Sequence, residues 1–207
     1  MTRYGMAIDL TRCFGCQACA AACKVANNLP KDIVYNRVLT VGGDFPDTPE
    51  GIFPNCTMSF MPVQCQHCEQ PACLDVCPTG ATSKDEETGI VSVDSEACIG
   101  CESCIKACPY EGVRTLIPND AGYYLDVVVG EVDAPAHKAM TVEKCTFCKN
   151  LIDRGEPPAC MQLCPGRARH WGDLDDPNSD VSKAIEGREY EFLNEAEGTK
   201  PSVYYLK

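Results

Sequence analysis

The sequence predicts an α+β fold in which short strands and short helices are joined by long loops. Its cysteines come in four tight groups, and glycine- and proline-rich stretches separate short runs of strand or helix character. The spacing of an aspartate, a cysteine and a glycine also occurs twice, at Asp9, Cys13 and Gly15 and again at Asp94, Cys98 and Gly100. We therefore expect a duplicated unit organised around the cysteines.

The composition indicates a metal protein. The chain has 207 residues, 17 cysteines and a formal net charge of −12. An odd number of cysteines, all except Cys56 in compact groups, does not suit a disulfide framework. The negative charge disfavours a nucleic-acid partner, because phosphate binding requires basic patches.

The third cysteine group has the most specific spacing. Cys98, Cys101, Cys104 and Cys108 are separated by two, two and three residues, and Pro109 follows the last of them. This is the ferredoxin run for a cubane 4Fe–4S cluster, in which three thiolates hold one cluster and the fourth reaches another. The run therefore requires at least one more group of the same kind.

The other groups share the plan of three cysteines plus one. They are Cys13, Cys16, Cys19 and Cys23; Cys65, Cys68, Cys73 and Cys77; and Cys145, Cys148, Cys160 and Cys164. Pro78 and Pro165 close groups two and four, whereas Lys24 follows group one. Four 4Fe–4S clusters are therefore the expected cofactors.

The first quarter of the chain predicts a strand, a helix and a second strand. Residues 4–10 alternate in polarity as a strand does, and the alanine-rich residues 17–28 favour a helix. Residues 33–41 are rich in β-branched side chains and predict another strand. The prolines within residues 42–55 indicate a surface loop.

Shorter elements are expected around the later groups. Two runs at 82–84 and 90–93 flank a turn and predict a hairpin between groups two and three. An apolar run at 113–117 and a strand-like segment at 123–129 follow group three. The insertion within group four predicts a helical turn that ends at Gly155.

The end of the chain predicts a short helix at 180–187 and an apolar tail at 203–206 that docks on its own domain or on a partner. Because the hairpin joins groups two and three, we expect these groups to share one ferredoxin-like two-cluster domain, and groups one and four to form the other. The expected division is residues 1–55 plus 137–175, an inserted domain at 56–118, a connecting segment at 119–136 and a docking tail at 176–207.

Ligand exchange within each domain predicts a nested pairing of the groups. The first three cysteines of a group hold one cluster, and its last cysteine crosses to the other cluster of the domain. The expected sets are Cys13, Cys16, Cys19 with Cys164; Cys145, Cys148, Cys160 with Cys23; Cys65, Cys68, Cys73 with Cys108; and Cys98, Cys101, Cys104 with Cys77. A rival pairing, group one with two and three with four, follows the order of duplication.

Side chains outside the groups have secondary roles in this interpretation. Cys56 is expected to be a buried free thiol and not a ligand. His67 is expected beside a cluster or at a docking surface, because its group already has four thiols. Lys106, Lys144 and Lys149 either offset cluster charge or lie on the solvated surface. Zinc is the competing metal, but it requires neither this spacing nor a closing proline.

The sequence lacks motifs for substrate chemistry. It contains no glycine-rich dinucleotide fingerprint, Walker A motif, haem site or nucleophile elbow. We therefore expect no catalytic residue and no catalytic activity in the chain by itself. No apolar run is long enough for a secretory signal or a membrane span, so the chain alone is expected in the cytoplasm.

Together with residues 4–9 and 172–177, the four groups resemble the four-cluster iron–sulfur (B) subunits of molybdopterin oxidoreductases, such as those of dimethyl sulfoxide reductase and polysulfide reductase. The resemblance covers nearly the whole chain and implies electron transfer in anaerobic respiration. It also implies nested pairing, a catalytic subunit with a molybdenum or tungsten pterin cofactor, and often a membrane subunit that exchanges electrons with quinol.

Two further expectations follow from this resemblance. Where the catalytic partner carries a twin-arginine signal, the subunit is carried with it to the extracytoplasmic face of the membrane. The alternative function is a soluble multi-cluster ferredoxin or a hydrogenase-linked carrier, which would purify without a pterin-containing chain.

Overall fold

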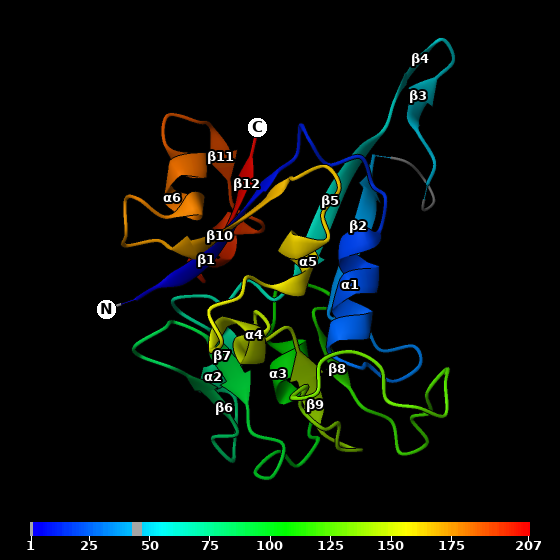
Figure 1. Ribbon diagram of the computed structural model, residues 1–207, viewed down its shortest axis with the longest axis vertical. Coiled ribbons are helices and arrows are strands. Elements are labelled where there is room, and N and C mark those ends of the chain that lie inside the picture. Colours follow the sequence, from blue (N-terminus) through cyan, green and yellow to red (C-terminus); the bar gives the residue numbers. More distant parts are fainter. Residues whose placement is uncertain (1, 43–46) are drawn as a thin grey trace.

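The computed structural model describes residues 2–42 and 47–207, and its architecture is the expected α+β arrangement of short elements and long loops (Figure 1). A four-stranded sheet lies in one half of the molecule, and two of the small two-stranded sheets lie beside short helices in the other half. Within the described residues, no helix combines the length and the apolar character needed to cross a membrane.

The N-terminal strand forms the middle of the four-stranded sheet. Strand β1 (Tyr4–Asp9) pairs antiparallel with β10 (Arg169–Asp173) and parallel with β12 (Val203–Leu206), and β11 (Tyr190–Glu191) completes the order β10-β1-β12-β11. Helix α6 (Asp180–Ile185) packs on this sheet, while the 3₁₀ turn Glu195–Glu197 precedes β12. The predicted strand, helix and tail are therefore confirmed, and the tail docks on its own chain.

The expected alanine-rich helix is α1 (Ala18–Ala26), which begins just after Cys13 and Cys16 and contains Cys19 and Cys23 of group one. Small side chains let it approach α5 (Ala159–Gln162) closely, and Ala22 and Ala159 share one buried cluster. Helix α4 (Lys149–Ile152) forms the turn predicted in the group-four insertion, and Gly155 adopts a left-handed φ of 81° shortly after it.

Residues 50–57 form a projecting hairpin that the sequence did not predict. Strands β3 (Glu50–Ile52) and β4 (Asn55–Thr57) pair with each other beyond the longer ribbon of β2 (Asn36–Val41) and β5 (Ser59–Gln64). The expectation of a loop is wrong at 50–52 and at 55, and residues 43–46 lie outside the described residues. Pro49 and Pro54 flank β3 and β4 rather than interrupting them, which is where strands tolerate proline.

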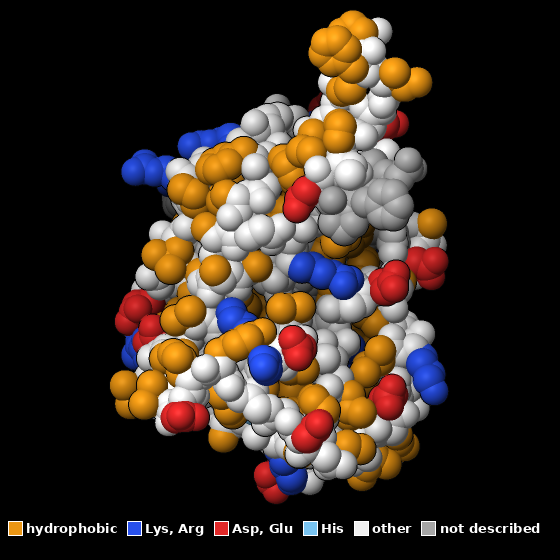
Figure 2. All heavy atoms as spheres, turned by 90° about the vertical axis from the view of Figure 1, so that its right-hand side faces the viewer, with side chains coloured by type: hydrophobic (Ala, Val, Ile, Leu, Met, Phe, Trp, Pro, Cys, Tyr) orange, Lys and Arg blue, Asp and Glu red, His pale blue; other side chains and the backbone are white. Residues whose placement is uncertain are grey.

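The tip of this hairpin carries apolar side chains in solvent (Figure 2). Ile52 and Phe53 are 84% and 86% exposed. Cys56, expected to be buried, is exposed because it lies on a two-stranded arm with no covering layer. A correction also applies to 123–129, where the described backbone is irregular and forms no strand.

The other half of the molecule repeats the arrangement of the first in compact form. Helices α2 (Ala72–Asp75) and α3 (Ser103–Lys106) are neighbours, as α1 and α5 are. Hairpin β6 (Thr82–Lys84) and β7 (Val91–Val93) is as predicted, and β8 (Arg114–Leu116) pairs with β9 (Val142–Lys144).

The duplication is visible in strand pairing. The strand after group four, β10, pairs with the strand before group one, β1. The strand after group two, β6, pairs with the strand before group three, β7. Both pairs are antiparallel, so the same contact is made once across the whole chain and once within a hairpin.

Candidate iron–sulfur sites

Group one and the end of group four meet at one small pocket. Cys13, Cys16, Cys19 and Cys164 all line it. The loop before α1 turns through Gly15, whose φ of 73° is left-handed, and this turn lets the first two cysteines face the same space as the third. Cys16 is exposed, so this pocket lies at the molecular surface.

A second pocket has the same composition in the other half. Cys77, Cys98, Cys101 and Cys104 line it, with Cys101 exposed. The loop again turns through a left-handed glycine, Gly100, with φ of 67°. The last cysteine of group two therefore lies with the first three of group three.

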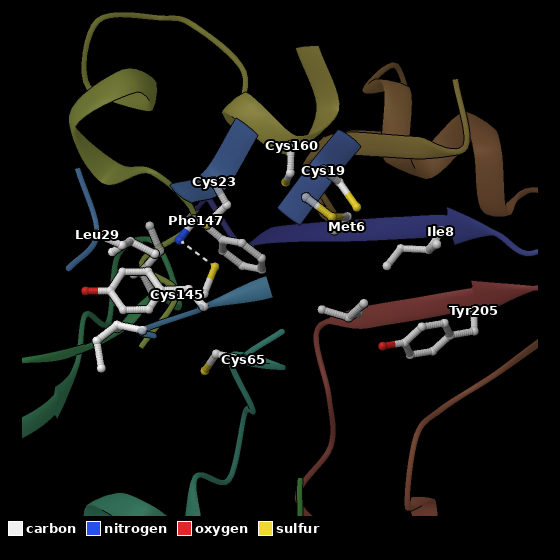
Figure 3. Close-up of a cluster of buried hydrophobic side chains, with 14 of the residues drawn as sticks. Met6, Ile8, Cys19, Cys23, Leu29, Cys65, Cys145, Phe147, Cys160 and Tyr205 are labelled. Atoms are coloured by element: carbon white, nitrogen blue, oxygen red, sulfur yellow. Dashed lines mark hydrogen bonds between the residues drawn. The ribbon is translucent and has the colours of Figure 1, made fainter. Parts of the chain in front are cut away.

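The remaining cysteines of groups one and four gather in the core, as Figure 3 shows for Cys23, Cys145 and Cys160. Cys23 and Cys148 are bridged by Asn27, whose Nδ2 lies 3.6 Å from the Sγ of Cys23 and 3.9 Å from that of Cys148. Burial raises the pKa of the Cys23 thiol well above its usual range, and the neighbouring thiols of group four raise it further.

The remaining cysteines of groups two and three also lie near one another: Cys65 and Cys73 are close enough to Cys108 to interact with it electrostatically, and Cys73 also packs with Cys104. Cys68 and Cys108 pack in one cluster with Tyr110, whose hydroxyl is 2.5 Å from the Thr199 hydroxyl. Burial raises the pKa of Cys108 to about 12; the Tyr110 backbone lowers it, while thiols of group two add to the rise. Every cysteine that the sequence assigned to a cluster thus lies beside cysteines of another group, and Cys56 does not.

The environment of the thiols differs between surface and core. Burial raises the pKa of Cys160 to about 11, so this thiol is protonated at neutral pH without a metal. At Cys77 burial raises the pKa of the thiol, but the hydrogen bonds from Thr82 and Thr79 outweigh it and lower the pKa to about 7. Since cluster ligands are thiolates, loading the core sites releases protons.

Two buried arginines, which the sequence interpretation missed, offset the charge of these thiolates. Arg114 donates from its guanidinium to the Sγ of Cys73 at 2.9 Å and is also electrostatically coupled to Cys104. Arg169 lies 3.8 Å from the Sγ of Cys160 and is coupled to Cys19. Each arginine therefore stands between the two cysteine sets of its half. The only sequence signal was the position of each arginine a few residues after the last cysteine of a group, Arg114 after Cys108 and Arg169 after Cys164.

Of the three lysines expected either to offset cluster charge or to lie on the solvated surface, one is buried and two are exposed. Lys144 is 2% exposed and donates to the carbonyls of Val91 and Cys145 inside the protein. Lys106 is exposed, and Lys149 forms an exposed ion pair with Asp153. Among these three lysines, only Lys144 therefore has its charge in the protein interior.

His67 is fully buried beside the ligand loop of group four. Its ring stacks on Phe147 with centroids 3.8 Å apart, and Phe147 meets Trp171 edge-on at 4.7 Å. Burial and the nearby Lys144 and Arg114 lower the pKa of His67 well below its usual range, so the ring is neutral. Of the two expected positions for His67, the structure shows the one beside the cysteines.

The donor sets fit 4Fe–4S clusters. Four thiols line each of the two pockets, and N–H groups point at several sulfurs, as from Thr82 to Cys77 at 3.4 Å and from Ala168 to Cys164 at 3.3 Å. Such N–H contacts stabilise cluster thiolates. No three possible ligands among the described residues are close enough to hold a single metal ion, whereas a cubane is larger than an ion.

Comparison with known proteins agrees with this chemistry. A family model for a 4Fe–4S dicluster domain matches residues 56–119 and 132–174. The chain is 42% identical over 212 residues to a Halobacterium salinarum protein named as an iron–sulfur subunit of dimethyl sulfoxide reductase, an alignment that covers 100% of this chain and 79% of that protein.

Two other relatives are similar over nearly all of the chain. The Escherichia coli K12 protein NrfC is 37% identical over 203 residues, covering 98% of this chain and 79% of its own length. The arsenate respiratory reductase iron–sulfur subunit ArrB of a Shewanella species is 34% identical over 238 residues, covering 99% of this chain and 96% of its own. The chain therefore belongs to the iron–sulfur electron-transfer subunits of molybdopterin oxidoreductases, and its cysteines account for four 4Fe–4S clusters.

Proposed function

We propose that this subunit passes electrons through its four clusters between a redox partner and a molybdopterin catalytic subunit, and performs no substrate chemistry itself. The observation that carries the proposal is the arrangement of the cysteines: two sets line surface pockets and two lie in the core between them. Buried clusters can exchange electrons only with neighbouring clusters, whereas surface clusters can exchange them with partner proteins.

We propose the nested ligand assignment for these clusters. The surface clusters are bound by Cys13, Cys16, Cys19 and Cys164, and by Cys98, Cys101, Cys104 and Cys77. The core clusters are bound by Cys145, Cys148, Cys160 and Cys23, and by Cys65, Cys68, Cys73 and Cys108. The pocket linings and the strand pairs β1–β10 and β6–β7 support this assignment over the rival pairing.

The same contacts support a division into two ferredoxin-like domains. Residues 1–55 plus 137–175 would hold groups one and four, and residues 56–118 would form the inserted domain with groups two and three. Segment 119–136 would connect them, and 176–207 would be the docking tail, which contributes β11 and β12 to the first domain's sheet.

Apolar side chains at the rim of each surface pocket support partner contacts there. Phe14 and Leu163 are 58% and 62% exposed next to ligands of one surface cluster. Ile99 is 65% exposed and Val76 is 41% exposed next to ligands of the other. One rim would face the pterin-containing subunit, and the other a soluble donor or a quinol-reacting membrane subunit, in whichever compartment the catalytic subunit occupies.

The proposal is tested by purifying the subunit anaerobically from its native source. We expect about sixteen iron and sixteen acid-labile sulfide per chain, since four cubanes contain four of each, and a co-purifying large chain with molybdenum or tungsten and a pterin. About eight iron, or a protein that purifies alone and reduces several unrelated enzymes, contradicts it.

The ligand assignment has its own test. Because Cys108 is assigned to the cluster of Cys65, Cys68 and Cys73, Cys108→Ser should alter the electron paramagnetic resonance signal of that cluster. A substitution at Cys65 identifies the signal. The exposed Cys56→Ser is the matched control and should keep all sixteen irons. If Cys108→Ser disturbs only the cluster of Cys98, Cys101 and Cys104, the nested assignment is wrong.

A further inference from the structure

The aromatic pair of His67 and Phe147 joins the ligand loops of the two core sites. Each ring is the third residue of a loop that begins and ends with a cysteine, Cys65 to Cys68 in one case and Cys145 to Cys148 in the other. Both residues have left-handed backbone conformations, with φ of 44° and 57°. The two loops therefore direct equivalent side chains against each other, and the rings stack at 3.8 Å.

The protonation of the His67 ring follows from one hydrogen bond. The backbone N–H of Val91 donates to Nδ1 at 3.1 Å, and an amide nitrogen can only donate. Nδ1 is therefore an acceptor without a proton, and in the neutral ring Nε2 carries the hydrogen.

Because His67 is 0% exposed, this Nε2–H is buried, and it has no hydrogen-bond partner among the described residues. The Cys145 carbonyl lies near the ring and accepts from Lys144 Nζ at 2.8 Å, but its position does not meet hydrogen-bond geometry with Nε2. A buried donor left unpaired costs about 1–3 kcal/mol. A sulfur of the iron–sulfur cluster that these loops would bind is the acceptor that would satisfy this Nε2–H donor.

We propose that His67 is a positioning residue for electron transfer, whose Nε2–H donates to a sulfur of the core cluster bound by Cys145, Cys148, Cys160 and Cys23. The side of the ring near Cys145 selects this cluster rather than the one at Cys65. A donated hydrogen bond stabilises the more negative, reduced cluster and so raises its reduction potential. Val91 and Phe147 hold the ring in position. The inference rests on the proposed ligand assignment.

The direct test is a histidine nitrogen coupling in the intact complex. The protein is labelled with ¹⁵N only in histidine, the core clusters are reduced, and pulsed paramagnetic resonance is recorded. We expect a weak histidine ¹⁵N coupling that disappears in His67→Phe and persists in His137→Phe and His170→Phe. Since the unmodified protein already carries the readout, its lack of any histidine coupling overturns the proposal even if the variants fail to fold.

Redox titration gives the second readout. His67→Phe keeps the stacked ring but removes the donor, so the potential of one core cluster should fall while the other three remain unchanged. His67→Gln, which retains an N–H, should recover part of the shift. Asn27→Leu serves as a marker, because Asn27 contacts Cys23 and Cys148.

The outcomes separate this inference from the proposed function. If His67→Phe moves the same signal as Asn27→Leu, the donor is directed at the predicted cluster. If it moves a different signal or none, the inference is wrong. In both cases about sixteen irons per chain leave the four-cluster electron-transfer function intact.

Discussion

Arg114 and Arg169 place positive charge inside the protein, each between two cysteine sets. Both residues are 3% exposed, and their guanidinium groups lie close to sulfur, Arg114 at 2.9 Å from Cys73 and Arg169 at 3.8 Å from Cys160. A net charge of −12 on the chain would otherwise disfavour adding electrons to the clusters. The arginines therefore act locally against the field of the whole chain.

Replacing either arginine by methionine should lower the potentials of the clusters beside it. A positive charge about 8 Å from the centre of a cluster, at an effective dielectric constant of about 20, changes the reduction free energy of that cluster by about 2 kcal/mol. This is on the order of 90 mV for one electron. Redox titration followed by paramagnetic resonance measures the shift. The exposed Lys106→Met is the matched control. Equal shifts in the control and the arginine variants would rule out a local effect.

Asp9 and Arg188 connect the first strand to the end of the chain. Asp9 Oδ2 accepts from the Arg188 guanidinium at 2.5 Å, and the Arg188 side chain also donates to the Lys207 carbonyl at 3.1 Å. Burial would raise the pKa of Asp9, but the hydrogen bonds from Arg188 and Thr11 outweigh it and lower the pKa to about 2.

Asp9→Asn should reduce the free energy of unfolding at pH 7 by about 1–2 kcal/mol, allowing for screening at the one-third exposed Arg188. Because the folded pKa is depressed, the stabilisation is fully present above pH 4 and is lost as the pH falls towards 2. Urea unfolding of Asp9→Asn, Arg188→Met and the double variant measures the coupling. Additive losses would show that the two side chains do not interact energetically.

The two surface ligand loops use the same glycine turn but differ in what surrounds it. A Cβ on Gly100 would lie 2.4 Å from the backbone oxygen of Met140, whereas the three nearest atoms to a Cβ on Gly15 belong to the half-buried ring of Phe60. Both glycines have left-handed φ, so alanine costs each loop about 1 kcal/mol of strain. Of the nearest atoms to each added Cβ, only those at Gly100 include rigid backbone.

Gly100→Ala should therefore lose the cluster of its own loop, while Gly15→Ala should retain about sixteen irons because the Phe60 ring can turn aside. Iron and sulfide analysis with paramagnetic resonance of both variants provides the comparison. Equal loss of iron in the two variants would mean that backbone strain alone, rather than the Met140 collision, decides loading.

The projecting hairpin β3–β4 shows where an element escapes prediction. Its three-residue strands are too short for an alternating pattern to stand out, and the prolines beside them indicate a loop. Residues 123–129 fail in the opposite direction, because they have strand-like composition but exposed side chains such as Val127 and Val128. A strand forms only where another strand is available to pair with it, and the β-propensity of a segment does not indicate whether such a partner exists.

At the scale of the whole molecule, the cysteines belong to the hydrophobic core. In the described part of the chain, nine of the cysteines assigned to clusters are buried, and five of these pack in one side-chain cluster with residues such as Ile8, Phe147 and Tyr205. The clusters would fill space between the elements that no side chain fills. Metal binding and folding are coupled in such sites.

Anaerobic removal of iron with a chelator and a mild oxidant should therefore unfold the protein broadly. We expect loss of ordered circular dichroism and rapid proteolysis beginning with the ligand loops, and recovery after reconstitution with iron and sulfide. Zinc should not restore the fold, because its tetrahedral sites are smaller than a cubane. A folded, protease-resistant apoprotein would contradict the coupling.

The sequence by itself determined the features that depend on local chain geometry. The spacing within each cysteine group, the prolines after Cys77, Cys108 and Cys164, and the repeated Asp-Cys-Gly spacing indicated four clusters and a duplicated α+β unit, because a loop of a few residues can encircle only one cluster. The helix at α1 and the hairpin β6–β7 were predictable for the same reason, since their signals lie within a few residues.

Only the tertiary structure decided which distant groups meet. It brought Cys164 beside Cys13, placed Arg114 and Arg169 between cysteine sets, and stacked His67 on Phe147. It also put Cys56 in solvent, where composition suggested burial. These features depend on packing between segments far apart in the chain, and the free energy that selects them comes from burying shared surfaces.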